Sequence, residues 1–347
     1  MYQPMKTTTN RHFFQRTLLG LTALFIFAGT LFAEEAQQFT ADKERIIRTV
    51  RFLSEEVFPR TTCPANKEKT IEFIINSIAD AGLEATRGEF MIRQILGDAE
   101  ITIELNSYTY TNIHALRKGK TDRRIIVAAH YDALAHTPGA DDNASGVAVL
   151  IELAHFLSRT PKLNLDVELV FYDLEEDGLL GSWYHARKLR TRGVDVVAML
   201  NLDMVGYFSD APNSQRYPVA NMGSIVGTRG DFLAVFGRTE DAPLMLKANR
   251  VFQEKTSVRI AAVPMGRGWE FLLSFSDHAP FWREGYPALL FTDTADFRNR
   301  HYHRATDTWD TLDYDRLVQV PVGIYHLILA IDAANAPQDE NRRAMAE

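Results

Sequence analysis

The chain has 347 residues, of which 46% are hydrophobic and 24% are charged, a composition typical of a globular protein with a large core. Its formal net charge is −7 and it contains no run of Lys and Arg, which excludes nucleic-acid binding through a basic face. The single cysteine, Cys63, excludes both an intrachain disulfide and a zinc site built from thiolates. Any metal site in this chain must therefore use His, Asp and Glu.

The first 33 residues differ in composition from the rest of the chain. Lys6, Arg11 and Arg16 precede an apolar run over residues 17–33, and polar residues follow it. This pattern predicts a secretory signal peptide, with an uncleaved N-terminal membrane anchor as the alternative. We therefore expect residues 34–347 to form the folded domain of an exported protein, periplasmic or secreted.

Two segments near the start of that domain, 40–57 and 66–84, have apolar residues at helical spacing. Two predicted strands, "ITIELNSY" (101–108) and "TNIHAL" (111–116), follow them. From about residue 123 to 333, strands and helices then alternate. The predicted strands cover 123–132, 165–176, 194–206 and 286–294, and the predicted helices cover 143–159, 179–190, 277–285 and 314–335.

This alternation predicts an α/β fold in which a mostly parallel mixed β-sheet is sandwiched between α-helices. Residues 207–275 contain the turn-rich stretches "SDAPNSQRYP" and "PMGRGWE". We expect this segment to form irregular loops over the sheet.

Acidic residues and a histidine follow the predicted strands, at the point where each strand ends. His130 and Asp132 end the first strand, Glu175 and Glu176 end the second, and Asp203 ends the third. The carboxyl ends of parallel strands meet at one edge of a sheet, where such folds place their sites. Buried carboxylates in one place repel each other unless a cation lies between them. A mixture of His and carboxylate ligands favours zinc, and one bridging carboxylate allows two ions.

The loop "HYDALAHTPGADDNASG" (130–146) contributes further acids between two apolar segments. Pro138 and Gly139 turn the chain, and Asp142 stands where the next helix begins, which suits a bridging ligand. Asp141 has a second possible role as the cap of that helix.

Five motifs resemble those of the M28 family of zinc aminopeptidases. They are "HYD…PGADDNASG", "EEDGLLGS", "NLDMVG", "SDHAPF" and "YHRATDT", and they occur in the order and approximate spacing of that family over roughly residues 110–310. The resemblance implies a single domain similar to the zinc exopeptidases over residues 34–347.

The resemblance also implies roles for individual residues. Two zinc ions would be bound by five ligands, with Asp142 as the bridge. His130 and Asp203 would complete the site of one ion, and Glu176 and His303 that of the other.

Four further residues have implied roles around these ligands. Glu175 would be the general base that takes a proton from the attacking water. Asp132 would orient the imidazole of His130, and Asp277 would support the ligands from behind. Tyr302 would contact the substrate or its oxyanion, although ordinary packing explains it equally well.

The resulting hypothesis is a two-zinc aminopeptidase that hydrolyses N-terminal residues from peptides with a free N-terminus. One alternative is acyl transfer of the glutaminyl-peptide cyclotransferase kind, typical of a single zinc ion, and another is a non-catalytic binding protein of the same fold. Removal of C-terminal residues would need a cation for the substrate carboxylate, for which Arg267 and Arg298 are candidates. The sequence says nothing about the oligomeric state.

Overall fold

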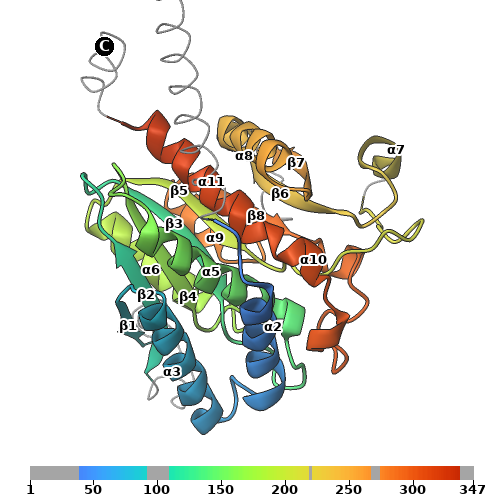
Figure 1. The fold of residues 1–347 in the computed structure, drawn as a ribbon, viewed down its shortest axis with the longest axis horizontal. Coiled ribbons are helices and arrows are strands. Elements are labelled where there is room, and N and C mark those ends of the chain that lie inside the picture. The colour runs from blue at the N-terminus through green and yellow to red at the C-terminus, as the bar shows by residue number, and fades with distance from the viewer. Residues whose placement is uncertain (1–38, 92–108, 219–220, 267–273, 337–347) are drawn as a thin grey trace, which may run out of the picture. The chain divides into compact units, whose positions relative to one another are not determined.

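An eight-stranded mixed β-sheet runs through the protein (Figure 1). The structure is a computed structural model that describes residues 39–91, 109–218, 221–266 and 274–336, and the chain from Ala41 onward forms one compact unit. The strand order is β1-β2-β4-β3-β5-β8-β6-β7. The strands are β1 (Ala85–Phe90), β2 (Tyr110–Arg117), β3 (Arg124–His130), β4 (Asp166–Tyr172), β5 (Val196–Leu202), β6 (Phe232–Arg238), β7 (Arg259–Met265) and β8 (Ala288–Thr292).

The four central strands, β4, β3, β5 and β8, are parallel to one another. Their sequences are continuous apolar runs such as "RIIVAAH", and almost every residue is buried, as expected for strands covered on both faces. The sheet becomes antiparallel where β2 joins β4 and where β6 joins β8. Pro264 lies in β7, an edge strand, where a missing backbone donor is tolerated.

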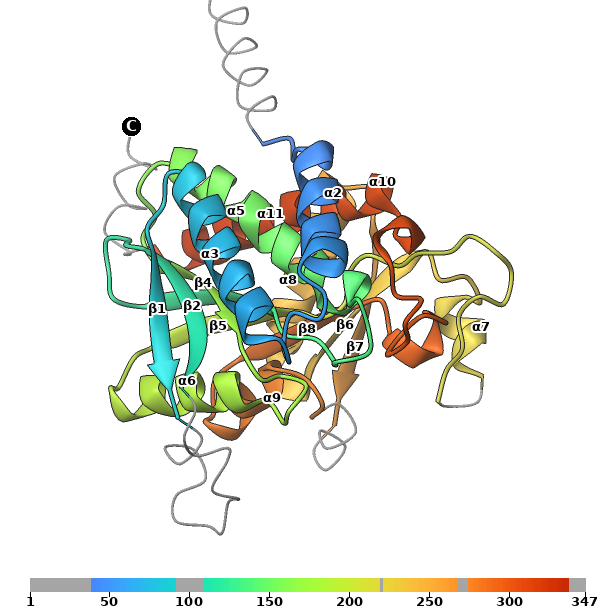
Figure 2. The ribbon, with the colours of Figure 1, turned by 90° about the horizontal axis from the view of Figure 1, so that it is seen from below.

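Helices cover both faces of this sheet (Figure 2). On one face α5 packs against α2, α3 and α11, and α8 packs against α11; on the other face α6 and α9 contact each other. The helices are α2 (Lys43–Arg51), α3 (Pro64–Asp80), α5 (Gly146–Arg159), α6 (Leu180–Thr191), α7 (Met222–Val226), α8 (Ala242–Lys255), α9 (His278–Arg283), α10 (Tyr314–Leu317) and α11 (Gln319–Ala334), with short helical turns at Phe52–Glu56, Ala140–Ser145, Thr239–Asp241, Ala295–Phe297 and Trp309–Thr311.

The predicted fold class, an α/β fold with a mostly parallel mixed sheet between helices, is therefore confirmed. The predicted alternation of strands and helices from 123 to 333 is also confirmed, except over residues 207–275. The expectation of irregular loops over 207–275 is wrong. That segment contributes β6, α8 and β7, because "FLAVFGR" is a buried apolar run and α8 buries Met245, Ala248 and Phe252 on one side. The predicted strand 101–108 and the predicted signal or anchor over 1–33 lie outside the described residues.

A buried ion pair joins α2 to α5. Glu152 is fully buried in α5, and the Arg45 guanidinium from α2 binds both of its carboxylate oxygens, with Nη2 2.9 Å from Oε2. The backbone N–H of Asp42 donates to the same Oε2 at 2.9 Å. A buried carboxylate is stable only while such partners remain, so this pair attaches the first helix to the core.

Replacing Arg45 by Met should lower the free energy of unfolding by about 3–5 kcal/mol, since it leaves the carboxylate of Glu152 buried without its cation. The double change Arg45→Met and Glu152→Leu should recover most of that loss. Urea denaturation measures both effects. Arg87→Met is the control, because Arg87 pairs with Glu68 at the surface and should cost less than about 1 kcal/mol. Equal losses for Arg45→Met and Arg87→Met would contradict this account.

Candidate metal centre

Three parallel strands deliver predicted site residues to one edge of the sheet. His130 is the last residue of β3, Asp203 directly follows β5, and Glu175 and Glu176 lie in the turn after β4. Asp142 comes from the helical turn Ala140–Ser145, where its own backbone leaves helical geometry with φ −103° and ψ 87°. His303 comes from a loop far along the chain and has a left-handed backbone with φ 56°.

The five predicted ligands lie together as two groups of three that share Asp142. In the first group, Nε2 of His130 lies 3.2 Å from Oδ1 of Asp142 and 3.4 Å from Oδ1 of Asp203. In the second group, Nε2 of His303 lies 3.2 Å from Oδ2 of Asp142 and 3.4 Å from Oε2 of Glu176. The two oxygens of Asp142 thus face two different imidazoles, which is the arrangement that a bridging carboxylate requires. The roles of these five residues as ligands stay a prediction.

The chemistry of this donor set fits zinc. Two ligands bound tetrahedrally at zinc distances lie about 3.4 Å apart, close to the separations in both groups. In the described part of the chain, Oδ2 of Asp142 and Oε1 of Glu176 are buried without a well-aligned hydrogen bond. Buried carboxylate oxygens normally have partners, and a cation is the partner that suits two imidazoles and several carboxylates.

The protonation behaviour of these groups reflects an excess of buried negative charge. Burial, together with the neighbouring Asp142, raises the pKa of Glu176 to about 7. Burial likewise raises the pKa of Glu175 well above its ordinary value, and the nearby Asp203 adds to this rise. Burial also opposes the ionised form of Asp142, but contacts with His130 and His303 outweigh it and hold that pKa well below its usual range. The site thus favours a positive charge close to Asp142.

Asp132 contacts His130 and the backbone of Glu175 and Glu176. Its carboxylate oxygens accept hydrogen bonds from the backbone N–H groups of Glu175 at 3.2 Å and Glu176 at 3.1 Å. Its Oδ1 lies 3.4 Å from Nδ1 of His130, on the side of the ring away from Asp142. One carboxylate therefore orients an imidazole and fixes the turn that carries two other site residues.

Asp277 and Tyr302 are the predicted supporting residues that belong to neither group of ligands. Asp277 is fully buried, and burial raises its pKa to about 7. Its neighbour Ser276 donates from Oγ to Oδ2 of Asp203 at 2.5 Å, a support that the sequence analysis missed. The ring of Tyr302 stacks on that of His303 with centroids 3.7 Å apart.

Two acids that were not predicted as site residues hold the loops in place. Asp307 is buried, and its two oxygens accept the backbone N–H groups of Asp141 at 2.9 Å and Asp142 at 3.2 Å. Asp141 accepts from the backbone N–H of Gly206 at 2.9 Å and from Nδ2 of Asn299 at 2.7 Å. The sequence analysis offered Asp141 a second role as a helix cap, which is wrong. Asp141 instead connects the loop that follows β5 to the loop that precedes His303.

Arg60 is the buried cation of this region, and no sequence signal pointed to it. It is 2% exposed, and its guanidinium donates to the backbone oxygens of the loop that carries the predicted ligands. The acceptors are the carbonyls of Tyr131 (2.7 Å), Pro138 (2.5 Å), Gly139 (2.9 Å) and Asp142 (3.2 Å), with Leu53 (3.2 Å) joining from the N-terminal segment. Only the rigid fork of an arginine can bind so many acceptors at once.

Two further histidines and the two arginines considered for a substrate carboxylate lie outside the two groups. His136 is exposed, with Nε2 3.3 Å from the carbonyl of His303, and Nδ1 of His301 contacts Oγ1 of Thr306 at 2.9 Å. Arg298 is buried inside the fold, where it donates to the carbonyl of Phe232 at 2.7 Å and to Gln215 at 2.8 Å. Arg267 lies outside the described residues.

Comparison with known proteins identifies relatives over most of the chain. A model of peptidase family M28 matches residues 112–328. The uncharacterized protein YfbL of Escherichia coli (strain K12) is 35% identical over 305 residues, which cover 83% of this chain and 88% of that protein. A probable leucine aminopeptidase of Trichophyton verrucosum is 29% identical over 227 residues, which cover 62% of this chain and 55% of that protein. The match thus spans just over half of the fungal protein.

Solved structures share the fold. A zinc aminopeptidase from Bacillus subtilis superposes with a TM-score of 0.65 at 17% identity, over 87% of this chain and 98% of that chain. The glutaminyl cyclase of Porphyromonas gingivalis superposes with a TM-score of 0.61 at 18% identity, over 83% of this chain and 98% of that chain. The same fold therefore occurs in proteins named for two different reactions.

Replacing Arg60 by Ala should weaken zinc binding about 10- to 100-fold, because the loop that carries Asp142 loses the guanidinium that binds its carbonyls. The free energy of unfolding should fall by about 2–4 kcal/mol. Arg60→Lys should recover only part of either loss, since an ammonium cannot reach all the acceptors. Calorimetric zinc titration and urea denaturation measure the two effects.

The matched control is Arg238→Ala, which removes a guanidinium bound to Asp241 and to the carbonyl of Tyr286. That variant should lose stability while its zinc affinity stays at the wild-type value. Wild-type zinc affinity in the Arg60→Lys variant would contradict the proposed role of the Arg60 guanidinium.

Proposed function

Because the chain belongs to peptidase family M28, we propose that it is a two-zinc aminopeptidase that hydrolyses the N-terminal residue of peptides with a free N-terminus. The observation that carries this proposal is the shared carboxylate of Asp142, with one imidazole at each of its oxygens. A site for a single ion would not need a second group of ligands around the other oxygen. The assignment of two zinc ions rests on this geometry and on the likeness to zinc aminopeptidases.

The ligands in this proposal are those that lie together at the sheet edge. Asp142, His130 and Asp203 hold one ion, and Asp142, Glu176 and His303 hold the other. When bound, the two ions would supply a water that ionises near neutral pH and would polarise the scissile carbonyl. Asp132, Ser276 and Asp307 keep the ligands oriented through the hydrogen bonds described above.

Glu175 is the proposed general base. It is 8% exposed and belongs to neither group of ligands, although it is next to Glu176. The raised pKa of Glu175 suits a carboxylate that accepts a proton from the attacking water and passes it to the leaving amine. Asp132 holds the Glu175 backbone in place through the N–H group, which leaves the side chain free for this role.

The acidic excess of the site suits a substrate with a positively charged amino group. The carboxylates of Glu175, Glu176 and Asp277 all have pKa values raised by burial. Glu176 would be neutralised by the bound zinc, but Glu175 belongs to neither group of ligands and would still favour an ammonium group over a substrate carboxylate. Arg298, one candidate cation for a C-terminal substrate carboxylate, is buried inside the fold. These points favour an aminopeptidase over a carboxypeptidase.

Cyclisation of an N-terminal Gln is the second candidate, favoured by the fold shared with a bacterial glutaminyl cyclase. Such a reaction also begins from a free N-terminus, but it releases ammonia and leaves the peptide bond intact. We regard it as the alternative because two complete groups of ligands are present. We further propose that residues 1–33 direct the enzyme to export, so that its substrates are peptides outside the cytoplasm.

Replacing Glu175 by Gln should lower kcat for an aminoacyl-nitroanilide by about 10²- to 10⁴-fold while the zinc content of the protein stays unchanged. The amide keeps the size of the side chain but cannot accept the proton. Asp177→Asn is the matched control in the same turn, because Asp177 is exposed and should leave turnover near the wild-type value. Near-normal turnover by a metal-loaded Glu175→Gln variant would rule out the base assignment.

Removal of zinc by a chelator should abolish hydrolysis, and restoring it should require at least two equivalents of zinc per chain. Mass spectrometry of a peptide with N-terminal Gln distinguishes the two reactions, since an aminopeptidase releases Gln and a cyclase forms pyroglutamate. Recovery with a single equivalent of zinc, together with pyroglutamate as the product, would establish the alternative.

A further inference from the structure

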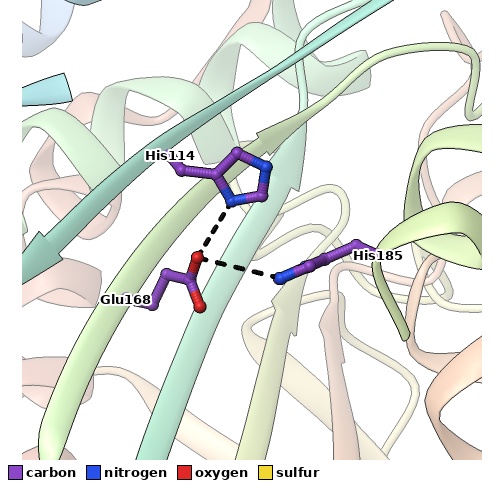
Figure 3. A group of neighbouring side chains, drawn as sticks. All are labelled: His114, Glu168 and His185. Atoms are coloured by element: carbon purple, nitrogen blue, oxygen red, sulfur yellow. Dashed lines mark hydrogen bonds and ion pairs between the residues drawn. The ribbon is translucent and has the colours of Figure 1, made fainter. Parts of the chain in front are cut away.

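A second cluster of potential metal ligands lies between the sheet and helix α6 (Figure 3). It contains His114 of β2, Glu168 of β4 and His185 of α6, none of which belongs to the site described above. Glu168 lies four residues before the end of β4. The cluster is therefore beneath α6, away from the carboxyl edge of the sheet where the first site lies. Glu168 and His185 are buried, and the His114 side chain is 18% exposed.

The ligand atoms converge in the way that a small cation requires. Nδ1 of His114 lies 2.9 Å from Oε1 of Glu168, and Nε2 of His185 lies 3.8 Å from the same oxygen. All three atoms lie within 4.8 Å of one another. The separation of 3.8 Å is too long for a hydrogen bond, but it is close to the spacing of two ligands on one zinc ion. A hydrogen bond accounts for the contact between Glu168 and His114, whereas Nε2 of His185 approaches the same oxygen without one, while its ring packs edge-on against that of His114 with centroids 4.7 Å apart.

The other polar atoms of the two buried residues already have partners. Arg124 donates from Nη1 to Oε2 of Glu168 at 2.8 Å, and the hydroxyl of Tyr172 lies 2.9 Å from Nδ1 of His185. Metal ligands in proteins are typically held in this way, through the atom that does not touch the metal. Oε1 of Glu168 and Nε2 of His185 are thereby directed toward each other.

The charge states of the cluster suit a metal ion. His185 is buried, and burial disfavours the positively charged form of its imidazole. Glu168 pairs with the guanidinium of Arg124 at 2.8 Å, which favours the ionised form of this buried carboxylate. A zinc site needs this combination of neutral imidazole and ionised carboxylate. The positive charge of Arg124 would oppose a cation, but Asp166 lies 3.5 Å from its guanidinium and offsets it.

We propose that His114, Glu168 and His185 form a further zinc-binding site, separate from the metal centre at the sheet edge, that joins β2, β4 and α6. With three protein ligands, the fourth position would be occupied by water on the side of the partly exposed His114. The ion would fix α6 to the sheet, and α6 begins directly after the turn that carries Glu175 and Glu176.

Gly88 on the neighbouring strand β1 offers a way to disturb the cluster without removing a ligand. A Cβ atom at residue 88 would lie 2.6 Å from Nε2 of His114, so that Gly88→Ala must push this ring aside. The clash involves the end of a side chain rather than backbone, and the fold should therefore persist. Gly88→Ala should weaken zinc binding at this site about 10-fold.

The test uses the full chain, stripped of metal, saturated with zinc alone and then freed of excess zinc. Elemental analysis should give one zinc fewer per chain for His185→Gln, and for Glu168→Gln, than for the wild type. Hydrolysis of an aminoacyl-nitroanilide should be retained, because the metal centre at the sheet edge is intact. Zinc should raise the thermal midpoint of the wild type more than that of either variant. His326→Gln, which removes a half-exposed imidazole from α11, is the control and should keep the wild-type zinc content.

Equal zinc content in the wild type and both ligand variants would overturn this proposal. So would thermal midpoints that fall by the same amount with and without zinc, since that result describes a hydrogen-bonded network. Gly88→Ala decides the matter if the ligand variants fail to fold, because an unchanged zinc titration in that variant would equally refute the site. A wild type that binds the extra zinc but cleaves no peptide would leave this proposal standing and refute the proposed activity.

Discussion

The mutual repulsion of buried carboxylates at one edge of the sheet is the constraint on which the rest of this structure depends. Asp142, Glu175, Glu176 and Asp203 converge there because three parallel strands end at the same edge and one loop folds over them. Burial disfavours the ionised form of each carboxylate, and the repulsion between neighbouring carboxylates disfavours it further. The arrangement needs compensating positive charge, which the imidazoles and the backbone N–H groups supply in part and which zinc would supply in the proposed enzyme.

The acids of this region divide into two kinds according to their partners. Asp132, Asp141 and Asp307 accept hydrogen bonds from backbone N–H groups and so serve as rigid templates for the loops. Asp142 and Glu176 instead each have one buried oxygen without a well-aligned hydrogen bond, and both carboxylates lie beside the imidazole of His303. The first kind fixes the positions of the second, and Arg60 complements both by binding the carbonyls of the same loop. The geometry of the site is thus held mainly by contacts with the main chain.

The parts that sequence analysis could predict are those with a local pattern. Apolar runs that end in acids identify both the central strands and the edge where His130, Glu176 and Asp203 meet. Arg60 and Asp141 could not be found in this way, because their contacts join residues that are far apart in the chain and follow no period. Asp307 was noticed only as part of a motif, although its two hydrogen bonds set the backbone at Asp142. The strands β6 and β7 were missed because turn-rich stretches flank them and β7 is a half-exposed edge strand.

The division of the Asp142 carboxylate between two imidazoles has a consequence for how the protein acquires its ions. Two positions that share a ligand are thermodynamically linked, so that occupancy of one changes the affinity of the other by an equal and reciprocal factor. The first cation would organise the carboxylate for the second, while its charge would oppose the second arrival. In the proposed two-zinc enzyme, the larger of these two effects would decide whether the second ion binds more tightly or more weakly than the first, and the metal available around the protein would set how many chains carry both.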